Sequence, residues 1–484
     1  MEEALLHGRE KIPVSTWEVF VEELKNVSYI AAPMVVVTVS QILSRVVSMM
    51  MVGHLGELAL SGAAVATSLA NVTGLSVLFG MASALETLCG QAFGAKQYQK
   101  LGVYTYASII CLLLVCLPIS LLWIFMDKLL IFMGQDPSIS VEAGRYAVWL
   151  IPALFPYAIL QSLVRYLQTQ SLILPMLWSS VAALLFHIPV CWALVFKLEL
   201  GTAGAALTIG LSYWFNVFLI LAYVKCSSTC KKTDAPSSKD ILPSMREFSR
   251  FAVPSAVMVC LEWWSCEIVV LLSGLLPNPQ LETSVLSVCL LVAALHYFIP
   301  YSIGAAASTR VSNELGAGRP DRARASVWAA NVLSIAEAIV ACTMLLRCRN
   351  LLGYAFSNEK EVGSPPEMII CLSLARNGLH PSRAFRTYSS FYLGSGVARG
   401  SGWQHLGAYV NLGAFYLVGL PTAVLLGFVL RLRGKGLWLG LNMGSIAQSA
   451  LLSFVTCSMN WKKQAALARQ RIFEEETTPD DGKS

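Results

Sequence analysis

The chain has 484 residues, of which 56% are hydrophobic and 13% charged, and its formal net charge is +6. Soluble domains carry about 25% charged residues, so this composition excludes an ordinary soluble protein and indicates an integral membrane protein. The apolar residues form long continuous runs, which predict membrane-spanning helices rather than the alternating strands of a barrel. We therefore expect the basic excess in cytoplasmic loops and not on a nucleic-acid-binding face.

Twelve apolar spans are expected, in two groups of six. They lie at 27–51, 58–80, 103–125, 146–166, 176–196 and 203–224, then 251–276, 284–304, 326–346, an irregular stretch near 366–394, 404–429 and 436–457. This pattern predicts an all-α membrane protein with two six-helix lobes.

Polar stretches set the expected boundaries. Residues 1–25 contain no apolar signal-peptide core, so we expect an uncleaved cytoplasmic segment. An N-lobe at 26–225 and a C-lobe at 251–458 are joined by a basic cytoplasmic linker at 226–250. The acidic end of the chain predicts a disordered cytoplasmic tail at 459–484.

The distribution of lysine and arginine predicts that both termini face the cytoplasm. The linker, the tail and the loops on their side are basic, whereas the loops at 51–57 and 277–283 contain no lysine or arginine. The side with fewer basic residues has one exception, the group Arg431, Arg433 and Lys435.

The two halves repeat each other. Pro33 corresponds to Pro254, 221 residues later, and QAFGAK at 91–96 corresponds to NELGAG at 313–318. Six spans per half keep both halves in the same orientation, so the repeat axis runs along the membrane normal. This architecture predicts a transporter whose lobes rock about a central cavity; a bundle without transport is the alternative.

The span 251–276 organises the predicted site, because this otherwise apolar helix carries Glu262 and Glu267. Each central acid costs about 3 kcal/mol on an insertion scale, and the apolar residues of the span return roughly 5 kcal/mol. The acids therefore need a cavity or partner helices. A carboxylate that exchanges a proton for a competing substrate is the minimal mechanism of an antiporter. The two acids lie about 140° apart around the helix, and the alternative makes each a hydrogen-bond partner between helices.

In the repeat, Glu262 corresponds to Gln41, so one lobe carries an acid where the other carries an amide. Pro33 and Pro254 each lie eight residues earlier. A proline frees a carbonyl and allows the helix to bend beside the polar residue, although membrane helices also tolerate prolines as plain kinks.

Further cavity candidates are the polar and aromatic residues Trp263, Trp264, Asn71, His296 and Tyr297. The tryptophans either stack on an aromatic substrate or simply pack. His296 is either a proton relay or a hydrogen-bonded core residue. Arg45 either binds an anionic substrate or reaches a lipid headgroup, and its position near a helix end favours the headgroup. No metal-ligand or nucleophile–base spacing stands out, so we expect neither a metal site nor an enzyme.

Long motifs carry a family resemblance. They include VVSMMMVGHLGELALSG, MASALETLCGQAFGAKQY, LEWWSCE, AASTRVSNELGAGRP and SGVARGSGWQHLGAYVNLGAFYLVGLP. Over about residues 25–362 and 395–460 the chain resembles the plant DETOXIFICATION branch of the multidrug and toxic compound extrusion (MATE) family. The resemblance implies twelve helices in two lobes and proton-coupled efflux of organic cations, xenobiotics, alkaloids or flavonoids at the vacuolar or plasma membrane. It places the carboxylate of the family's seventh helix on Glu262 and a second one on Glu267.

We expect this protein to act as a monomer in the lipid bilayer and to bind a small organic substrate but no nucleic acid. No cofactor is expected, and the expected coupling ion is H+ rather than Na+.

The resemblance breaks between Gly363 and Gly394, where the family has an apolar tenth helix with an aspartate. Here the stretch contains no aspartate and carries Arg376, Arg383 and Arg386. An altered reading frame, a splice form or a diverged helix explains this. Two alternatives therefore remain: a weakly active or non-transporting scaffold or sensor, and a flippase of the same superfamily, which needs a wide cationic groove.

Overall fold

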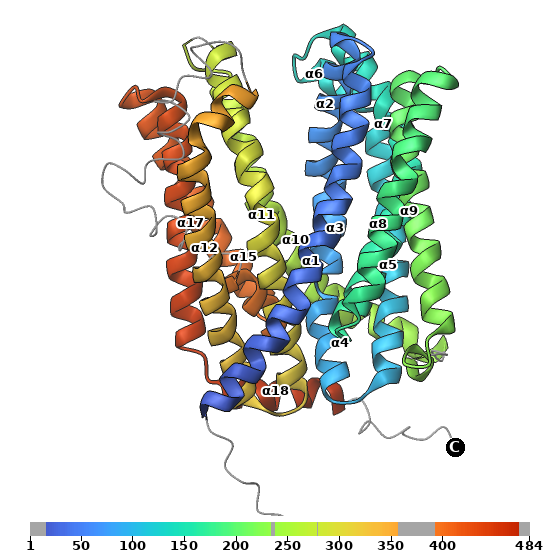
Figure 1. Cartoon of the computed structure of the whole chain (residues 1–484), viewed down its shortest axis with the longest axis vertical. Helices are drawn as coiled ribbons and strands as arrows, with labels where there is room; N and C mark the ends of the chain where they lie inside the picture. The colour runs from blue at the N-terminus through green and yellow to red at the C-terminus, as the bar shows by residue number, and fades with distance from the viewer. Residues whose placement is uncertain (1–15, 234–237, 278, 357–392, 474–484) are drawn as a thin grey trace, which may run out of the picture.

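The computed structural model describes residues 16–233, 238–277, 279–356 and 393–473. Nine helical stretches within these residues are long and apolar enough to cross a membrane. The helices form two bundles that stand side by side, the N-lobe and the C-lobe (Figure 1). The expected tenth span lies outside the described residues except for its last two positions.

The N-lobe contains the first six expected spans, each a little longer than its apolar run. Its elements are α1 (Thr16–Gly53), α2 (Glu57–Ala70), η2 (Asn71–Leu75), α3 (Ser76–Ala82), α4 (Leu85–Gly94), α5 (Tyr98–Ile124), α6 (Met126–Phe132), α7 (Pro137–Thr169), α8 (Ile173–Trp192), η3 (Ala193–Lys197) and α9 (Gly201–Cys226). The second span is helical from α2 across the π-helical turn η2 into α3, and after a turn at Ser83 and Ala84 it continues as α4.

The C-lobe holds the remaining described spans. Its elements are α10 (Ser238–Ser273), α11 (Pro279–Gly316), α12 (Pro320–Phe356), a short helix at 393–401, α15 (Gln404–Asn411), η5 (Leu412–Gly419), α16 (Leu420–Val424), η6 (Leu425–Val429), α17 (Arg433–Cys457) and α18 (Trp461–Phe473).

Three expected polar segments contain more helix than their composition suggested. α1 begins at Thr16, inside the expected segment 1–25, and α10 begins at Ser238, inside the expected linker. The expectation of a wholly disordered tail is wrong, because α18 occupies Trp461–Phe473. Its small and apolar residues fall on one helical face, which is buried at Gln464, Ala465, Ala468 and Ile472.

α1 crosses from one lobe to the other, changing direction part-way (Figure 1). Its beginning packs on α11 and α12 of the C-lobe, where buried Glu23 lies 2.7 Å from the guanidinium of Arg310 and accepts a hydrogen bond of 2.7 Å from Ser326. Its later part packs on α8 and α9 of the N-lobe. Pro33, inside the helix, removes one backbone hydrogen bond, which explains the bend.

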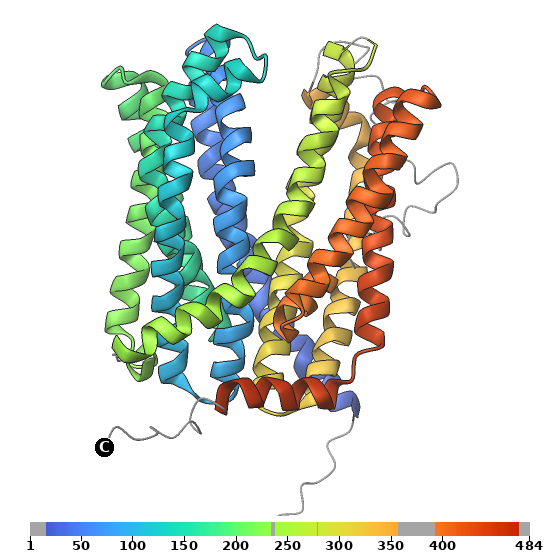
Figure 2. The ribbon, with the colours of Figure 1, turned by 180° about the vertical axis from the view of Figure 1, so that it is seen from behind.

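α10 makes the reciprocal crossing (Figure 2). Its beginning packs on α5 of the N-lobe, where Tyr104 donates a 2.6 Å hydrogen bond to Glu247, and its later part packs on α15 and α17. Pro254 lies inside this helix. The boundary expected near residue 250 therefore divides the sequence, while in space α1 and α10 each belong to both lobes.

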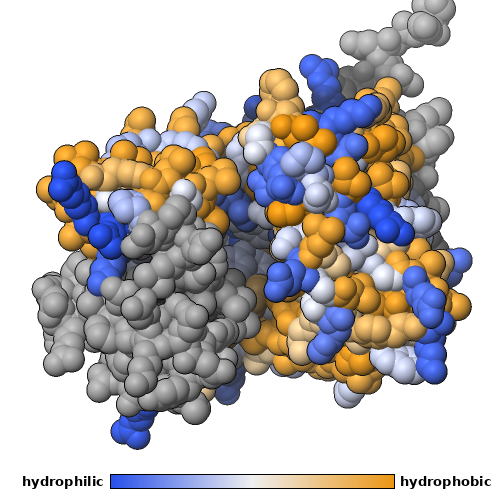
Figure 3. Space-filling view, turned by 90° about the horizontal axis from the view of Figure 1, so that it is seen from above, coloured by the Kyte–Doolittle hydropathy of each residue, from blue (hydrophilic) through white to orange (hydrophobic). Residues whose placement is uncertain are grey.

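The lobes meet at the end of the molecule where α1 begins and α18 lies, and they diverge at the other end (Figure 2). Seen from the diverging end, the surface recedes between them (Figure 3). Glycines permit the close contact between the lobes: a Cβ atom on Gly316 would overlap the carbonyl oxygen of Gln91, and one on Gly94 would overlap that of Asn313.

Candidate functional site

Glu262 and Glu267 project from α10 into different surroundings. Glu267 accepts a 2.8 Å hydrogen bond from the hydroxyl of Ser68 on α2, across the contact between the lobes. Glu262 is half-buried, and no hydrogen bond reaches its carboxylate from the described part of the chain. The cation that acts on it electrostatically is Arg399, in the helix at 393–401. Glu267 thus has a structural partner, whereas Glu262 retains the capacity to bind a proton or a cation.

Trp263 begins a row of aromatic rings that runs through both lobes. Its ring stacks on Phe79 of α3 with centroids 5.7 Å apart, and Phe79 lies 5.9 Å from Tyr301 of α11. Tyr301 in turn stacks on Tyr297 at 5.4 Å. The structure therefore brings together two of the predicted aromatic candidates, Trp263 and Tyr297, through two residues that the sequence did not single out.

Asn71 is the first residue of the π-helical turn η2, and Trp264 contacts the same turn. The indole nitrogen of Trp264 donates a 3.0 Å hydrogen bond to the carbonyl oxygen of Val72. The side-chain oxygen of Asn71 is buried without a hydrogen bond from any described residue. Trp264 is therefore a packing contact between the lobes, and Asn71 lies on a kind of helical irregularity that is frequent at functional sites.

A buried ionic cluster joins the lobes next to Phe79 and Tyr301 of the aromatic row. The carboxylate of Glu86 on α4 lies 3.0 Å from Arg399 of the C-lobe and 3.3 Å from Arg165 on α7. Arg165 also donates a 2.8 Å hydrogen bond to the Tyr301 hydroxyl, and its guanidinium lies 5.0 Å from the centre of the Phe79 ring. These three charged residues were not among the predicted site residues, although each carries the signal that identified Glu262, a charge inside an apolar helix.

Gln41 lies on α1, half-buried, one turn after Thr38. The Thr38 hydroxyl is 3.5 Å from that of Ser302 on α11, so this face of α1 lines the contact between the lobes. The imidazole of His296 instead lies 2.7 Å from the carboxylate of Glu337 on α12, within the C-lobe. The structure therefore shows His296 in the hydrogen-bonded arrangement that was its second interpretation.

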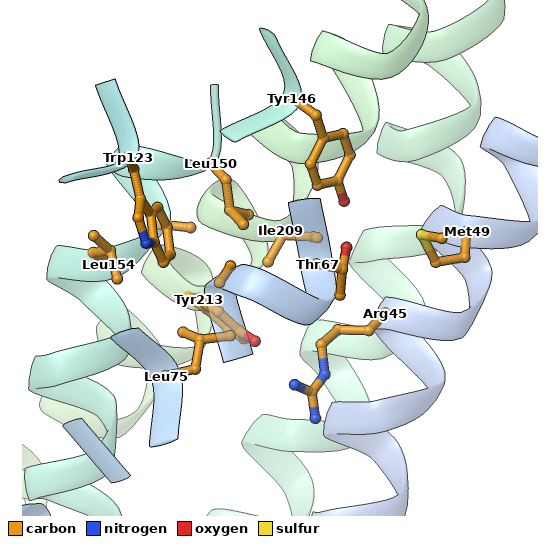
Figure 4. A pocket seen from close by; sticks show the side chains of 12 residues that line it. Arg45, Met49, Thr67, Leu75, Trp123, Tyr146, Leu150, Leu154, Ile209 and Tyr213 are labelled. Carbon is orange, nitrogen blue, oxygen red and sulfur yellow. The ribbon is translucent and has the colours of Figure 1, made fainter. Parts of the chain in front are cut away.

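Arg45 is half-buried on α1, and the expectation that it reaches a lipid headgroup stays a prediction. It lines a narrow pocket inside the N-lobe together with Thr67, Tyr146 and Tyr213 (Figure 4). The helix continues to Gly53, and α1 packs on α2 and α9.

One protein-family model matches most of this chain. The model of the MatE family matches residues 33–193 and 254–425, together more than half of the chain. This protein belongs to the MatE family of multidrug and toxic compound extrusion transporters. The two matches begin at Pro33 and Pro254, the same pair that anchors the internal repeat.

Relatives within the MatE family are similar along nearly the whole chain. Protein DETOXIFICATION 14 of Arabidopsis thaliana is 52% identical over 478 residues, which cover 98% of this chain and 96% of the relative. Protein DETOXIFICATION 3 of the same plant is 53% identical over 94% of both chains. These relatives confirm the resemblance to the plant branch of the family.

Solved MatE structures confirm the fold. The crystal structure of the eukaryotic MATE transporter AtDTX14 superposes with a TM-score of 0.88 at 53% identity, covering 94% of this chain and all of that one. A point mutant of the Vibrio cholerae MATE transporter VcmN superposes with a TM-score of 0.79 at 15% identity, covering 92% of this chain and 99% of that one. The expected two-lobe fold of twelve membrane helices is therefore correct, and the protein is a multi-pass membrane transporter.

Proposed function

We propose that this MatE protein is a proton-coupled antiporter that exports organic cations, xenobiotics or secondary metabolites such as alkaloids and flavonoids across the vacuolar or plasma membrane. The observation that carries the proposal is the state of Glu262. Its half-buried carboxylate lies where the lobes meet, receives no hydrogen bond from the described residues and adjoins Trp263 in the aromatic row. A carboxylate beside aromatic faces is suited to a planar organic cation.

Competition at Glu262 provides the coupling. An ionised carboxylate attracts a cation, and a protonated one is neutral and does not. Proton and substrate therefore bind alternately to the same group, and each can drive the other across the membrane when the lobes change position. Gln41, the counterpart of Glu262 in the N-lobe, cannot titrate, so the proposal assigns the exchange to the C-lobe.

Arg399 links this exchange to the motion of the lobes. Its guanidinium pairs with Glu86 of the N-lobe at 3.0 Å and also acts electrostatically on Glu262. A change of charge at Glu262 therefore alters the balance of charge around an ion pair that holds the lobes together. If the lobes open at the end of the molecule where α18 lies, the ion pair between Arg399 and Glu86 must separate.

The remaining features of the proposal follow from the chain itself. Both lobes belong to one polypeptide, which supports a monomeric transporter in the lipid bilayer. The exchange needs only a titrating carboxylate, so no cofactor is invoked, and the coupling ion is H+ rather than Na+. The relatives are transporters, which supports a function other than enzyme catalysis.

A second candidate function rests on residues 363–392, which lie outside the described part of the chain. Their three arginines and the missing aspartate support a weakly active or non-transporting variant that acts as a scaffold or sensor. Glu262 weighs against the flippase alternative, because a flippase of this superfamily needs a cationic groove and this acid receives no hydrogen bond from the described residues.

Transport by purified protein tests the proposal. Proteoliposomes with an acidic lumen should accumulate a fluorescent organic cation, and a protonophore that collapses the pH gradient should abolish the accumulation. A neutral analogue of the same size is the matched control and should not accumulate. Absence of cation transport would favour the scaffold or sensor, and transport that ignores the protonophore would exclude proton coupling.

A further inference from the structure

A groove opens on the C-lobe between α12 and α17, with the helix at 393–401 as its floor and α18 beside it (Figure 1). Its volume of about 380 Å³ is within the range of pockets that hold organic ligands. Trp328 on its wall is 57% exposed, so the groove opens to the outside of the molecule. Neither Glu262 nor the ionic cluster lines it, and the exchange proposed for Glu262 makes no use of it.

The groove reaches from one membrane boundary towards the middle of the bilayer. Arg324 lies just before the expected span 326–346, and Cys457 ends α17 at the same end of the molecule (Figure 1). From Arg324 to Ile335, α12 rises about 16 Å, which is roughly half of a 30 Å hydrocarbon core. The groove therefore has the depth of a single leaflet.

The walls change from polar to apolar along this depth. Arg324 is exposed at the boundary and makes no ion pair with another described residue. Trp328 and Trp461 lie near the same boundary, the level at which tryptophan is enriched in membrane proteins. Asn331, farther in, donates a 2.9 Å hydrogen bond to a carbonyl of its own helix. The inner lining is otherwise apolar and consists of Val327, Ile335, Leu393 and Val397.

The rim of the groove is positively charged. No acidic residue is among those that line it, and Asp321, one turn before Arg324, is not part of the lining. Lys462 and Lys463 follow Trp461 and are exposed. This end is the one predicted to face the cytoplasm, where the leaflet carries anionic lipids that basic residues attract. An exposed arginine selects no ligand by itself, so the selection comes from the basic rim, the tryptophans and the apolar depth together.

We propose that this groove binds an anionic phospholipid of the cytoplasmic leaflet, with its phosphate at Arg324 and one acyl chain along the apolar lining between α12 and α17. A zwitterionic phospholipid offers the same chain without the net charge. A soluble organic phosphate offers the charge without the chain. The anionic phospholipid is the ligand that matches both parts of the groove.

Native mass spectrometry of the full-length protein tests the charge selection. Phosphatidylglycerol and phosphatidylcholine with identical acyl chains are titrated separately, and the dissociation constant of the first bound lipid is measured. The wild type should prefer phosphatidylglycerol about fivefold, the expected effect of one basic residue near the headgroup. Arg324→Gln should remove this preference. Arg246→Gln changes an exposed arginine at the beginning of α10, outside the groove, so it is the matched control and should keep the preference.

A second variant tests the position of the acyl chain. Ser453 is an exposed residue of α17 that lines the groove, and a tryptophan there would occupy the space of the chain. Ser453→Trp should weaken the binding of both lipids about tenfold, the loss expected when about two methylene groups are no longer buried. Its melting temperature shows whether the variant is folded. Glycerol 3-phosphate, which lacks acyl chains, should not displace the lipid from the wild type.

The proposal is overturned if the wild type binds both lipids equally, or if Arg324→Gln keeps the preference for phosphatidylglycerol. An equal loss of preference in Arg324→Gln and Arg246→Gln would also overturn it, because the attraction would then belong to the whole surface. Displacement by glycerol 3-phosphate, or unchanged binding by folded Ser453→Trp, would rule out an acyl chain in the groove. If Ser453→Trp does not fold, the comparison of the two arginine variants decides.

Discussion

Glu262 and Glu267 lie five residues apart on one helix, yet the structure gives them different partners. Glu267 has the Ser68 hydroxyl at 2.8 Å, and glutamine at this position could still accept that hydrogen bond. Glu262 has no such partner among the described residues, and Arg399 influences it only through its charge. The two acids should therefore respond differently to the same substitution.

Glu262→Gln should abolish uptake driven by a pH gradient while leaving the melting temperature within a few degrees of the wild type, because the amide keeps the shape but cannot titrate. Glu267→Gln is the matched control and should lose less than about tenfold in rate, in line with the modest value of one hydrogen bond. Both variants are measured in proteoliposomes with the same fluorescent cation. Full exchange by Glu262→Gln would remove this residue from the mechanism.

Glu86→Gln should destabilise the protein strongly, because it leaves the guanidinium groups of Arg165 and Arg399 buried without the charge that they share. Removing one partner from a buried ionic group costs about 3–5 kcal/mol. Thermal unfolding in detergent measures this loss. Glu57→Gln, at the exposed start of α2, is the control and should change stability by less than about 1 kcal/mol. Equal melting temperatures for the two variants would show that the cluster does not hold the lobes together.

The sequence predicted the acids better than their partners. Glu262 was recognisable because an acid in an apolar span is costly, and the same argument applies to Glu86, Arg165 and Arg399. What the sequence could not predict is that Arg399 meets Glu86, which lies 313 positions away along the chain. Such a contact depends on how the lobes pack, and no local pattern records it.

The helix α18 lies across both lobes at the end of the molecule where they meet (Figure 2). The side chain of Lys100 on α5 donates a 2.5 Å hydrogen bond to the carbonyl of Ile472, and Arg471 donates one of 3.1 Å to Gln91 on α4. It also packs on α11 and α12 of the C-lobe. Burial lowers the pKa of Arg471, whose side chain is held against this surface.

Ending the chain after Asn460 should weaken the closure of this end, because the bridge between the lobes is lost. Hydrogen–deuterium exchange should become several-fold faster in α4 and in the last turns of α11, which α18 covers. The double variant Lys462→Gln/Lys463→Gln changes only exposed residues of α18 and should exchange like the wild type. Unchanged exchange in the shortened chain would mean that α18 does not contribute to closure.

The stretch 363–394 leads to a prediction from sequence alone. Each central arginine costs about 3 kcal/mol on the insertion scale, and the few leucines and isoleucines there return about half of one such charge. Replacing this stretch with an apolar helix that carries an aspartate, as in the family, should raise transport several-fold in proteoliposomes. Equal transport before and after the exchange would show that the missing acid matters less than the resemblance implies.

The sequence predicted elements well where apolar runs were long and poorly where they were interrupted. The expected spans of the N-lobe all match helices, with ends extended by several residues. α18 was missed because its helix has a polar composition and lies next to an acidic terminus. Only the burial of Gln464, Ala465, Ala468 and Ile472 reveals the face that packs on the lobes.

At the scale of the whole molecule, the internal repeat was the most informative feature of the sequence. The pairing of Pro33 with Pro254 predicted two equivalent lobes, and the family matches begin at the same two residues. The repeat could not reveal that α1 and α10 each cross to the other lobe, because this exchange depends on packing between the lobes. The exchange ties both helices to both lobes, so neither lobe can move without bending them.

The start of α1 and the whole of α18 lie at the same end of the molecule, as an even number of spans requires (Figures 1 and 2). That this end faces the cytoplasm is a prediction from the distribution of lysine and arginine. In this structure the cytoplasmic end would be closed and the opposite end open, which corresponds to one of the two states of an alternating-access transporter.

The central claim is that substrate and protons move in opposite directions through one titrating group. The most direct measurement loads proteoliposomes with a transported organic cation and a fluorescent pH indicator, starts with equal pH on both sides and dilutes the vesicles into cation-free buffer. Our account predicts that the lumen acidifies as the cation leaves, and that Glu262→Gln shows no acidification. Efflux of the cation from wild-type vesicles with a constant luminal pH would contradict it.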